Sequence, residues 1–430
     1  MKLHTKMFVG GLGGALLGIV AHLVIGGTPL LENVVRYVTQ PIGQVFLRLL
    51  FMLVVPLIVT ALALGVAGLG DLKSLGRIGL KTLAYTVTVS AIAVLLGVGL
   101  VNLIQPGTRM PEEMRQRVEA GMNKEAAVAT TATAPKSGLD LLVQMVPDNP
   151  IKAMANGDML AVMVFALFLG IGIALTRQQS SAVRSFEEAL QGLYDVTMRL
   201  IGMVISFAPY GVAALLFTLT AQLGYQILQQ LALYVFVVVL ALAIHQFVVY
   251  SVAVKVFGGM SPRVFFRGIE AAMLTAFSTA SSNATLPTAL KVAEENLKLP
   301  RHISRFVLTI GSTANQNGTA LFEGVTVLFL AQFYGVHLSL AEQFTVVFIC
   351  ILGGIGTAGV PAGSIPVVAL ILGMVGVPKE GIGLILGVDR FLDMCRTTIN
   401  VTGDLAAAVV VSKGESHPAA EDTEPDTTVG

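Results

Sequence analysis

Long apolar stretches separated by short polar connections dominate this chain. A helix needs about 20 mainly apolar residues to cross a bilayer. Eight stretches meet or approach that length, near residues 7–26, 41–69, 82–104, 158–176, 194–218, 228–254, 304–333 and 380–411. This pattern predicts an all-α polytopic membrane protein with eight transmembrane helices.

Two further apolar stretches, near residues 262–297 and 340–376, are interrupted midway. Polar residues and a proline break the first at 281–287, and glycines break the second at 353–364. Non-helical backbone at membrane depth is tolerated only where it is buried in protein or lines a polar cavity. We predict two re-entrant helical hairpins beside a polar site, and the likeness of their breaks suggests inverted repeats.

The composition agrees with a membrane protein, since 54% of the residues are hydrophobic and only 12% are charged. A net charge of +1 gives no electrostatic basis for binding nucleic acid, and we expect no such partner. Both cysteines, Cys350 and Cys395, lie in apolar stretches and imply no disulfide framework.

Lysine and arginine recur in alternate connections, which places both termini in the cytoplasm by the positive-inside rule. We expect a multi-pass protein in the lipid bilayer of the plasma membrane, here the inner membrane of a bacterium. The polar connection from residue 105 to about 158 would lie outside. Residues 413–430 would form a disordered acidic tail.

The last apolar stretch carries several ionic groups. Asp389, Asp393, Arg396, Asn400 and Asp404 follow one another by four, three, four and four residues, so a helix would place them on one face. An Asp or Arg facing lipid at the bilayer centre costs about 2.5–3.5 kcal/mol. The stripe must therefore face protein or water, and it is a candidate binding surface.

The hairpin breaks offer groups that could bind a ligand. At Ser281 and Ser282, a half-helix end would present free amides to a carboxylate, although small polar residues also simply let membrane helices pack closely. The glycine-rich break at 353–364 would present carbonyl oxygens to a monovalent cation, or is a flexible turn.

Polar residues also interrupt the seventh span, at Gly311 to Thr319. We predict unwinding at Gly318, which would free carbonyl oxygens for cations. Glu323, one turn further on, either carries a proton or is a structural carboxylate held by an arginine. We interpret His245 in the sixth span as an internal hydrogen bonder.

Four motifs in this order resemble the glutamate transporter family, the dicarboxylate/amino acid:cation symporters, over nearly the whole chain. The motifs are the Ser281-Ser282-Asn283 tip, the run Asn315-Gln316-Asn317-Gly318-Thr319, the segment Gly356-Thr357-Ala358-Gly359-Val360-Pro361, and Asp389 to Asp404. The resemblance implies a homotrimer that works by an elevator motion. Residues 1–78 and 106–224 would form the scaffold, and residues 79–105 and 225–412 the moving transport domain.

The same resemblance assigns the substrate contacts. Asp393 would hold an ammonium group and Arg396 a side-chain carboxylate, to which a guanidinium offers a planar bidentate fork. The resemblance implies that a chain with both Asp393 and Arg396 selects glutamate or aspartate. The remaining implied substrate contacts are Ser281, Ser282, Thr319, Val360, Asp389, Thr397 and Asn400.

Three family sodium sites have counterparts here. The first would use Gly311, Asn315, Asn400 and Asp404, and the second Thr313, Gly354, Ile355 and Thr357. The third is degraded, because Asn317 replaces a carboxylate, and Thr86 and Val89 replace a tyrosine and a threonine beside the retained Ser90. We predict weakened or absent binding there and fewer coupled sodium ions.

Two charged residues bear on the coupling. Glu323 matches the glutamate of animal carriers that resembles a proton carrier, which makes proton coupling plausible. Arg390 would supply the positive charge that some archaeal relatives have at the position of Ala280.

These patterns predict a secondary active symporter, not an enzyme, that imports L-glutamate or L-aspartate with sodium, protons or both and needs no cofactor. The alternative is a proton-driven symporter of succinate, malate or fumarate, for which Asp393 is poorly suited. A channel, or a hydrolase using Ser281 or Ser282, is a more distant rival. For hydrolysis, no His or Lys base stands at a convincing spacing.

Overall fold

The computed structural model of the protein describes residues 3–69, 77–108, 146–156, 159–356 and 364–414. Every regular element within these ranges is helical. The helices are α1 (Leu3–Ile25), α2 (Pro29–Val34), α3 (Gln40–Met52), α4 (Val54–Leu69), α6 (Arg77–Ile104), α9 (Pro150–Asn156), α10 (Met159–Thr176), α11 (Ser181–Leu223), α12 (Gln226–Ile244), α13 (Tyr250–Val252), α14 (Pro262–Gly268), α15 (Glu270–Thr279), α16 (Ser282–Glu295), α17 (Arg301–Ala314), α18 (Asn317–Phe333), α19 (Leu340–Gly356), α20 (Ile365–Met374) and α21 (Ile382–Ser412). The predicted all-α class is confirmed.

Five helical segments in the described ranges are long and apolar enough to cross a membrane by themselves. They are Thr5–Ile25, Pro29–Ala67, Arg77–Ile104, Ser181–Leu223 and Gln226–Phe257. The other three predicted crossings do not meet that criterion alone, because one is short (α10), one is interrupted (α17 and α18) and one carries the ionic stripe (α21). A multi-pass membrane protein is supported, and the count of eight crossings stays a prediction.

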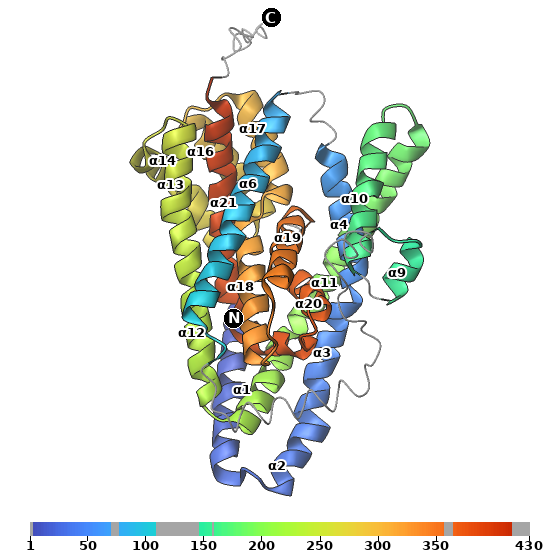
Figure 1. Ribbon diagram of the computed structural model, residues 1–430, viewed down its shortest axis with the longest axis vertical. Coiled ribbons are helices and arrows are strands. Elements are labelled where there is room, and N and C mark those ends of the chain that lie inside the picture. The colour runs from blue at the N-terminus through green and yellow to red at the C-terminus, as the bar shows by residue number, and fades with distance from the viewer. Residues whose placement is uncertain (1–2, 70–76, 109–145, 157–158, 357–363, 415–430) are drawn as a thin grey trace, which may run out of the picture.

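The helices pack in two groups around α21. In Figure 1, α21 runs upright beside α6, with α12 and α13 on one flank and α3, α4 and α10 on the other. α11 packs against α1, α3 and α4, whereas α21 packs against α12, α15, α17 and α18. The groups touch where α21 meets α11 and where α19 meets α4. The division into scaffold and transport domain stays a prediction.

The first predicted hairpin reverses direction between α15 and α16. Ala280 lies in the left-handed region, with φ of 50°, and ends α15, and the Ser281 side chain then caps α16 by accepting from the Ala284 N–H. Pro287, which the sequence placed in the break, lies inside α16. Because Ala280 already reverses the chain, the proline is not needed for the turn.

The seventh span is interrupted between α17 and α18, at Asn315 and Gln316. The predicted unwinding at Gly318 is wrong, since Gly318 is helical. A Cβ atom there would lie 2.6 Å from the Arg396 carbonyl oxygen and 2.9 Å from Ile399 Cβ. The glycine therefore lets α18 approach α21 closely.

In the second hairpin, α19 continues through Gly356, so the predicted break at Gly353 begins too early. A Cβ atom at Gly353 would lie 2.8 Å from Val367 Cγ1. The two arms of the hairpin thus pack tightly at this glycine. The predicted tip, including Thr357 and Val360, lies outside the described residues.

Helices α1 and α11 contact each other through glycines. A Cβ atom at Gly14 would lie 2.7 Å from Ala213 Cα, and one at Gly10 would lie 2.6 Å from the Pro209 carbonyl oxygen. The Thr220 hydroxyl donates to the Ala15 carbonyl across the same contact at 3.0 Å. Small residues thus bring two membrane helices to backbone contact distance.

We predict that Gly14→Ala lowers the stability of the protein by about 1–3 kcal/mol, because the added methyl overpacks the α1–α11 contact. Thermal unfolding in detergent measures the change. Gly13→Ala is the matched control, since a Cβ atom at Gly13 meets nothing within 4 Å. Equal melting temperatures for the two variants would contradict this account of the packing.

Candidate functional site

The ionic stripe of α21 faces the protein interior. Asp389, Asp393, Arg396, Asn400 and Asp404 are all buried. The hairpin helices α15 and α16 and the broken pair α17 and α18 pack against α21. The predicted orientation of the stripe is therefore confirmed.

Arg396 bridges two carboxylates. Its Nη1 donates to Asp389 Oδ1 at 3.0 Å, and its Nη2 donates to Asp393 Oδ1 at 2.8 Å. The guanidinium carbon lies 3.9 Å from the ring centroid of Phe322, which places the cation over an aromatic face. The sequence identified the three ionic residues but gave no sign of Phe322 as their partner.

A second arginine reaches the same cluster from its edge. Arg390 Nη1 lies 3.5 Å from Asp393 Oδ2, and 23% of the Arg390 side chain is exposed, against 1% for Arg396. Together Arg390 and Arg396 balance the two negative charges of Asp389 and Asp393. The cluster as a whole is close to neutral.

Asn400 joins α21 to the start of α18. Its Oδ1 accepts from the backbone N–H of Gly318 at 2.8 Å and of Thr319 at 3.4 Å, which satisfies first-turn amides that have no partner within the helix. Its Nδ2 donates to the Thr319 hydroxyl and to Gln316 Oε1. Thr319 and Asn400 are thus brought together as predicted. Gln316, which the sequence indicates only as part of a motif, also contacts Asn400.

Asp404 is a second buried carboxylate, and it lies beside Asn315 and Gly311. Asn315 Nδ2 donates to Asp404 Oδ1 at 2.9 Å, and a Cβ atom at Gly311 would lie 2.7 Å from Asp404 Cγ. Among the described residues, no Lys or Arg forms an ion pair with Asp404, and Asn315 Oδ1 is buried without a hydrogen-bond donor. Carboxylate and amide oxygens are ligands that a hard cation prefers, and both kinds are buried here.

Neutral hydrogen bonds connect residues of the third sodium site, which the sequence predicts to be degraded. The Ser90 hydroxyl donates to Asn317 Oδ1 at 2.6 Å, and Asn317 Nδ2 donates to the Tyr250 hydroxyl at 3.2 Å. Thr86 and Val89 are buried on the same helix as Ser90. Tyr250 was not identified from the sequence, because nothing in the sixth span indicates that it packs against Asn317 of α18.

The other candidate residues are less closely assembled. Ser282 and Thr397 are buried, whereas Thr313 is exposed and donates its hydroxyl to the Ile310 carbonyl of its own helix. A Cβ atom at Gly354 would lie 3.4 Å from the Gln316 carbonyl oxygen. The Ile355 side chain lies outside the described part of the structure, as do Thr357 and Val360, so the second sodium site stays a prediction.

Two buried titratable residues lie close to the site. Glu323 is fully buried, and its Oε2 would lie 3.0 Å from a Cβ atom at Gly353, so this carboxylate touches the second hairpin. The His245 ring packs edge-on against Tyr250 with centroids 4.7 Å apart. Within the described residues, neither nitrogen of His245 has a hydrogen-bond partner, so its interpretation as an internal hydrogen bonder is wrong.

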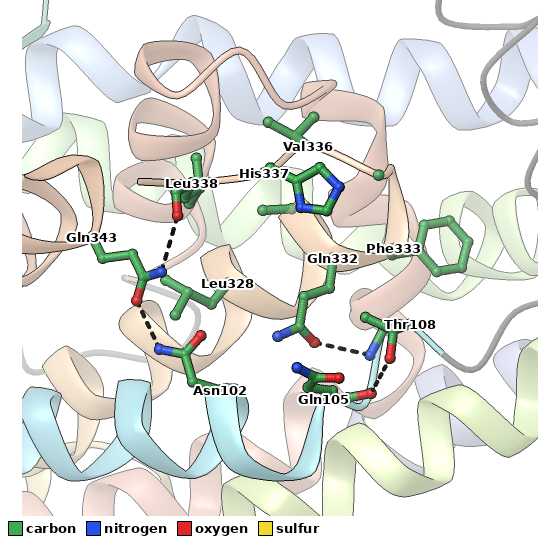
Figure 2. A pocket seen from close by; sticks show the side chains of 13 residues that line it. Asn102, Gln105, Thr108, Leu328, Gln332, Phe333, Val336, His337, Leu338 and Gln343 are labelled. Carbon is green, nitrogen blue, oxygen red and sulfur yellow. Dashed lines mark hydrogen bonds between the residues drawn. The ribbon is translucent and has the colours of Figure 1, made fainter. Parts of the chain in front are cut away.

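A separate pocket of about 310 Å³ lies at the ends of α6 and α18 and the start of α19 (Figure 2). Asn102 Nδ2 donates to Gln343 Oε1 at 2.7 Å, and Gln332 Oε1 accepts from the Gly107 N–H at 3.2 Å. The first contact ties α19, the first arm of the second hairpin, to α6, and the second ties the end of α18 to the residues that follow α6. The sequence did not indicate this pocket.

Comparison with known proteins adds independent information. Residues 3–414 match the model of the sodium:dicarboxylate symporter family. The chain is 34% identical to a "Proton/sodium-glutamate symport protein" of Bacillus subtilis (strain 168), over 98% of this chain and 95% of the relative. It is 34% identical to a "Proton/glutamate-aspartate symporter" of Escherichia coli (strain K12), over 87% of this chain and 85% of the relative. It is 30% identical to "Excitatory amino acid transporter 1" of Ambystoma tigrinum, over 89% of this chain and 78% of the relative.

Proposed function

The chain belongs to the sodium:dicarboxylate symporter family, and on that premise we propose that it is a secondary active symporter of L-glutamate or L-aspartate. The names of its relatives support an acidic amino acid as substrate and sodium, protons or both as coupling ions. The protein is a transporter and not an enzyme, so the site has only to bind, enclose and release its ligands.

The buried Asp389–Arg396–Asp393 cluster is the observation that carries this proposal. Arg396 already holds two carboxylates with its fork, so a substrate side-chain carboxylate can replace Asp393 at Nη2. The substrate ammonium then pairs with the released Asp393. The Arg396–Asp393 ion pair is replaced by two ion pairs, so Asp393 is not left without a cation, which would cost several kcal/mol. The α-carboxylate of the substrate is left for hydrogen-bond donors such as those at the Ser281 and Ser282 tip.

The Asp404 carboxylate supports cation coupling. It is buried and hydrogen-bonded to the Asn315 amide, whose own oxygen has no hydrogen-bond partner in the described residues, so a sodium ion could use oxygens of both residues. Asn315 is also adjacent to Gln316, whose side chain is hydrogen-bonded to Asn400. Sodium would thus stabilise the break between α17 and α18, where Asn400 and Thr319 contact each other. Coupling is the difference in substrate affinity between the sodium-bound and sodium-free states.

The larger-scale features of the proposal follow the family resemblance. They are a homotrimer in a bacterial inner membrane with cytoplasmic termini, a scaffold of residues 1–78 and 106–224, and an elevator motion of the remainder up to residue 412. Glu323 would be the proton carrier, and its contact with the second hairpin at Gly353 would let protonation affect closure of that hairpin.

The alternative substrate class is the four-carbon dicarboxylates that lack an amino group. Asp393 argues against them as main substrates, because they would displace it from its short contact with Arg396 without supplying an ammonium in exchange.

Uptake into proteoliposomes tests the function. We expect labelled L-glutamate or L-aspartate to accumulate inside under a sodium gradient alone, a proton gradient alone, or both. Arg396→Gln should abolish accumulation, because the variant lacks the carboxylate receptor. Arg305→Gln is the control, since its guanidinium is exposed and pairs with Glu294 away from the cluster. If neither gradient concentrates glutamate, aspartate or another dicarboxylate, the symporter proposal is wrong.

We predict that Asn317→Asp makes substrate binding depend more steeply on sodium concentration, because a carboxylate beside the Ser90 and Tyr250 hydroxyls restores an anionic cation ligand. Calorimetry of substrate binding over a range of sodium concentrations measures the slope. Asn33→Asp, which adds the same charge at an exposed position of α2, should leave the slope unchanged. An unchanged slope for Asn317→Asp would count against a degraded third site.

A further inference from the structure

Asp393 contacts two arginines, one through each of its carboxylate oxygens. Oδ1 accepts from Arg396 Nη2 at 2.8 Å, and Oδ2 faces Arg390 Nη1 at 3.5 Å. Both arginines lie on α21, three residues before and three residues after the aspartate. Nothing in the proposed exchange of ion pairs uses Arg390, although its charge belongs to the cluster.

The two contacts differ in strength. A separation of 3.5 Å is at the outer limit of a hydrogen bond, whereas 2.8 Å is typical of a short charge-assisted one. Arg390 also keeps about a quarter of its side chain exposed, while Arg396 is buried and covered by Phe322. Arg390 can therefore leave Asp393 for the exposed side of the cluster, and Arg396 cannot.

An acidic amino acid and an amino-free dicarboxylate place different demands on Asp393. Either substrate binds the Arg396 guanidinium through a carboxylate, so Asp393 loses its contact with Arg396. The amino acid compensates Asp393 with its own ammonium. The dicarboxylate brings no cation, and a buried carboxylate without a partner is strongly unfavourable.

We propose that Arg390 is a specificity-determining residue that serves as a replaceable counter-ion for Asp393. With an amino acid bound, the substrate ammonium takes Oδ2 and Arg390 turns towards water. With an amino-free four-carbon dicarboxylate bound, Arg390 stays on Asp393 and neutralises it. One site thus accepts acidic amino acids and, more weakly, the corresponding dicarboxylates. This inference rests on the proposed symport function and extends its substrate range.

Competition for uptake by the full-length protein in liposomes tests the proposal. Labelled L-aspartate uptake is inhibited with unlabelled L-aspartate or succinate at one pH and one sodium concentration, and the ratio of the two inhibition constants is compared between variants. In Arg390→Gln we expect the inhibition constant of succinate to rise and that of L-aspartate to fall. The ratio of the succinate constant to the aspartate constant should therefore increase about ten-fold or more. Arg390→Lys keeps the positive charge and should keep a ratio close to that of the parent.

The control is Arg305→Gln, which removes one exposed positive charge from α17 and should not change the ratio. Arg390→Met is a second neutral variant if the glutamine variant does not fold. A ratio in a folded neutral variant within about three-fold of the parent value overturns the proposal. The proposal is also overturned if succinate in large excess fails to inhibit L-aspartate uptake by the parent protein. In both cases the parent still transports aspartate, whereas a parent that transports no acidic substrate contradicts the proposed function itself.

Discussion

The structure depends on one electrostatic constraint, that a carboxylate taken out of water needs a cation or a set of hydrogen bonds in its place. Three aspartates of α21 are buried in the helix bundle. Two of them share Arg396, whose guanidinium lies over Phe322, and the third lies beside Asn315 without an ion-pair partner in the described ranges. In the proposed function, the nearly neutral cluster binds the substrate and the Asp404 carboxylate binds the cation.

The break between α17 and α18 lies opposite the buried polar residues of α21. Asn400 can satisfy the first amides of α18 only because α17 and α18 separate at Asn315 and Gln316, opposite α21. Gly318 allows the backbones to approach closely enough for that contact. The result links the proposed substrate position to the proposed cation position through Asn400 and Gln316, and neither position is formed by one helix alone.

Much of this architecture could be predicted from the sequence, because apolar length and ionic spacing are local properties. The stripe from Asp389 to Asp404 follows from helical periodicity alone, and its burial follows from the cost of placing charge in lipid. The placement of the breaks could not be derived in the same way. Gly318 and Pro287 are usually helix breakers, yet both are helical here, since one serves close packing and the turn beside the other is made by Ala280.

Partners distant in the sequence were also beyond prediction. Phe322 under Arg396 and Tyr250 beside Asn317 are apolar or aromatic residues in apolar helices, and only the packing of those helices shows what they contact. His245 illustrates the opposite error, because a buried polar residue was expected to be hydrogen-bonded and instead packs edge-on against an aromatic ring. The contacts of Phe322 and of Tyr250 with Asn317 are contacts between helices, which one sequence does not contain.

The most direct test of the charge constraint is the effect of sodium on thermal stability without substrate, with choline replacing sodium at constant ionic strength. A cation that binds only the folded protein raises its melting temperature. We predict that sodium raises the melting temperature of the parent and raises that of Asp404→Asn by less, because the amide variant needs no counter-ion. An equal rise in the two proteins would contradict the assignment of Asp404 as the carboxylate that sodium compensates.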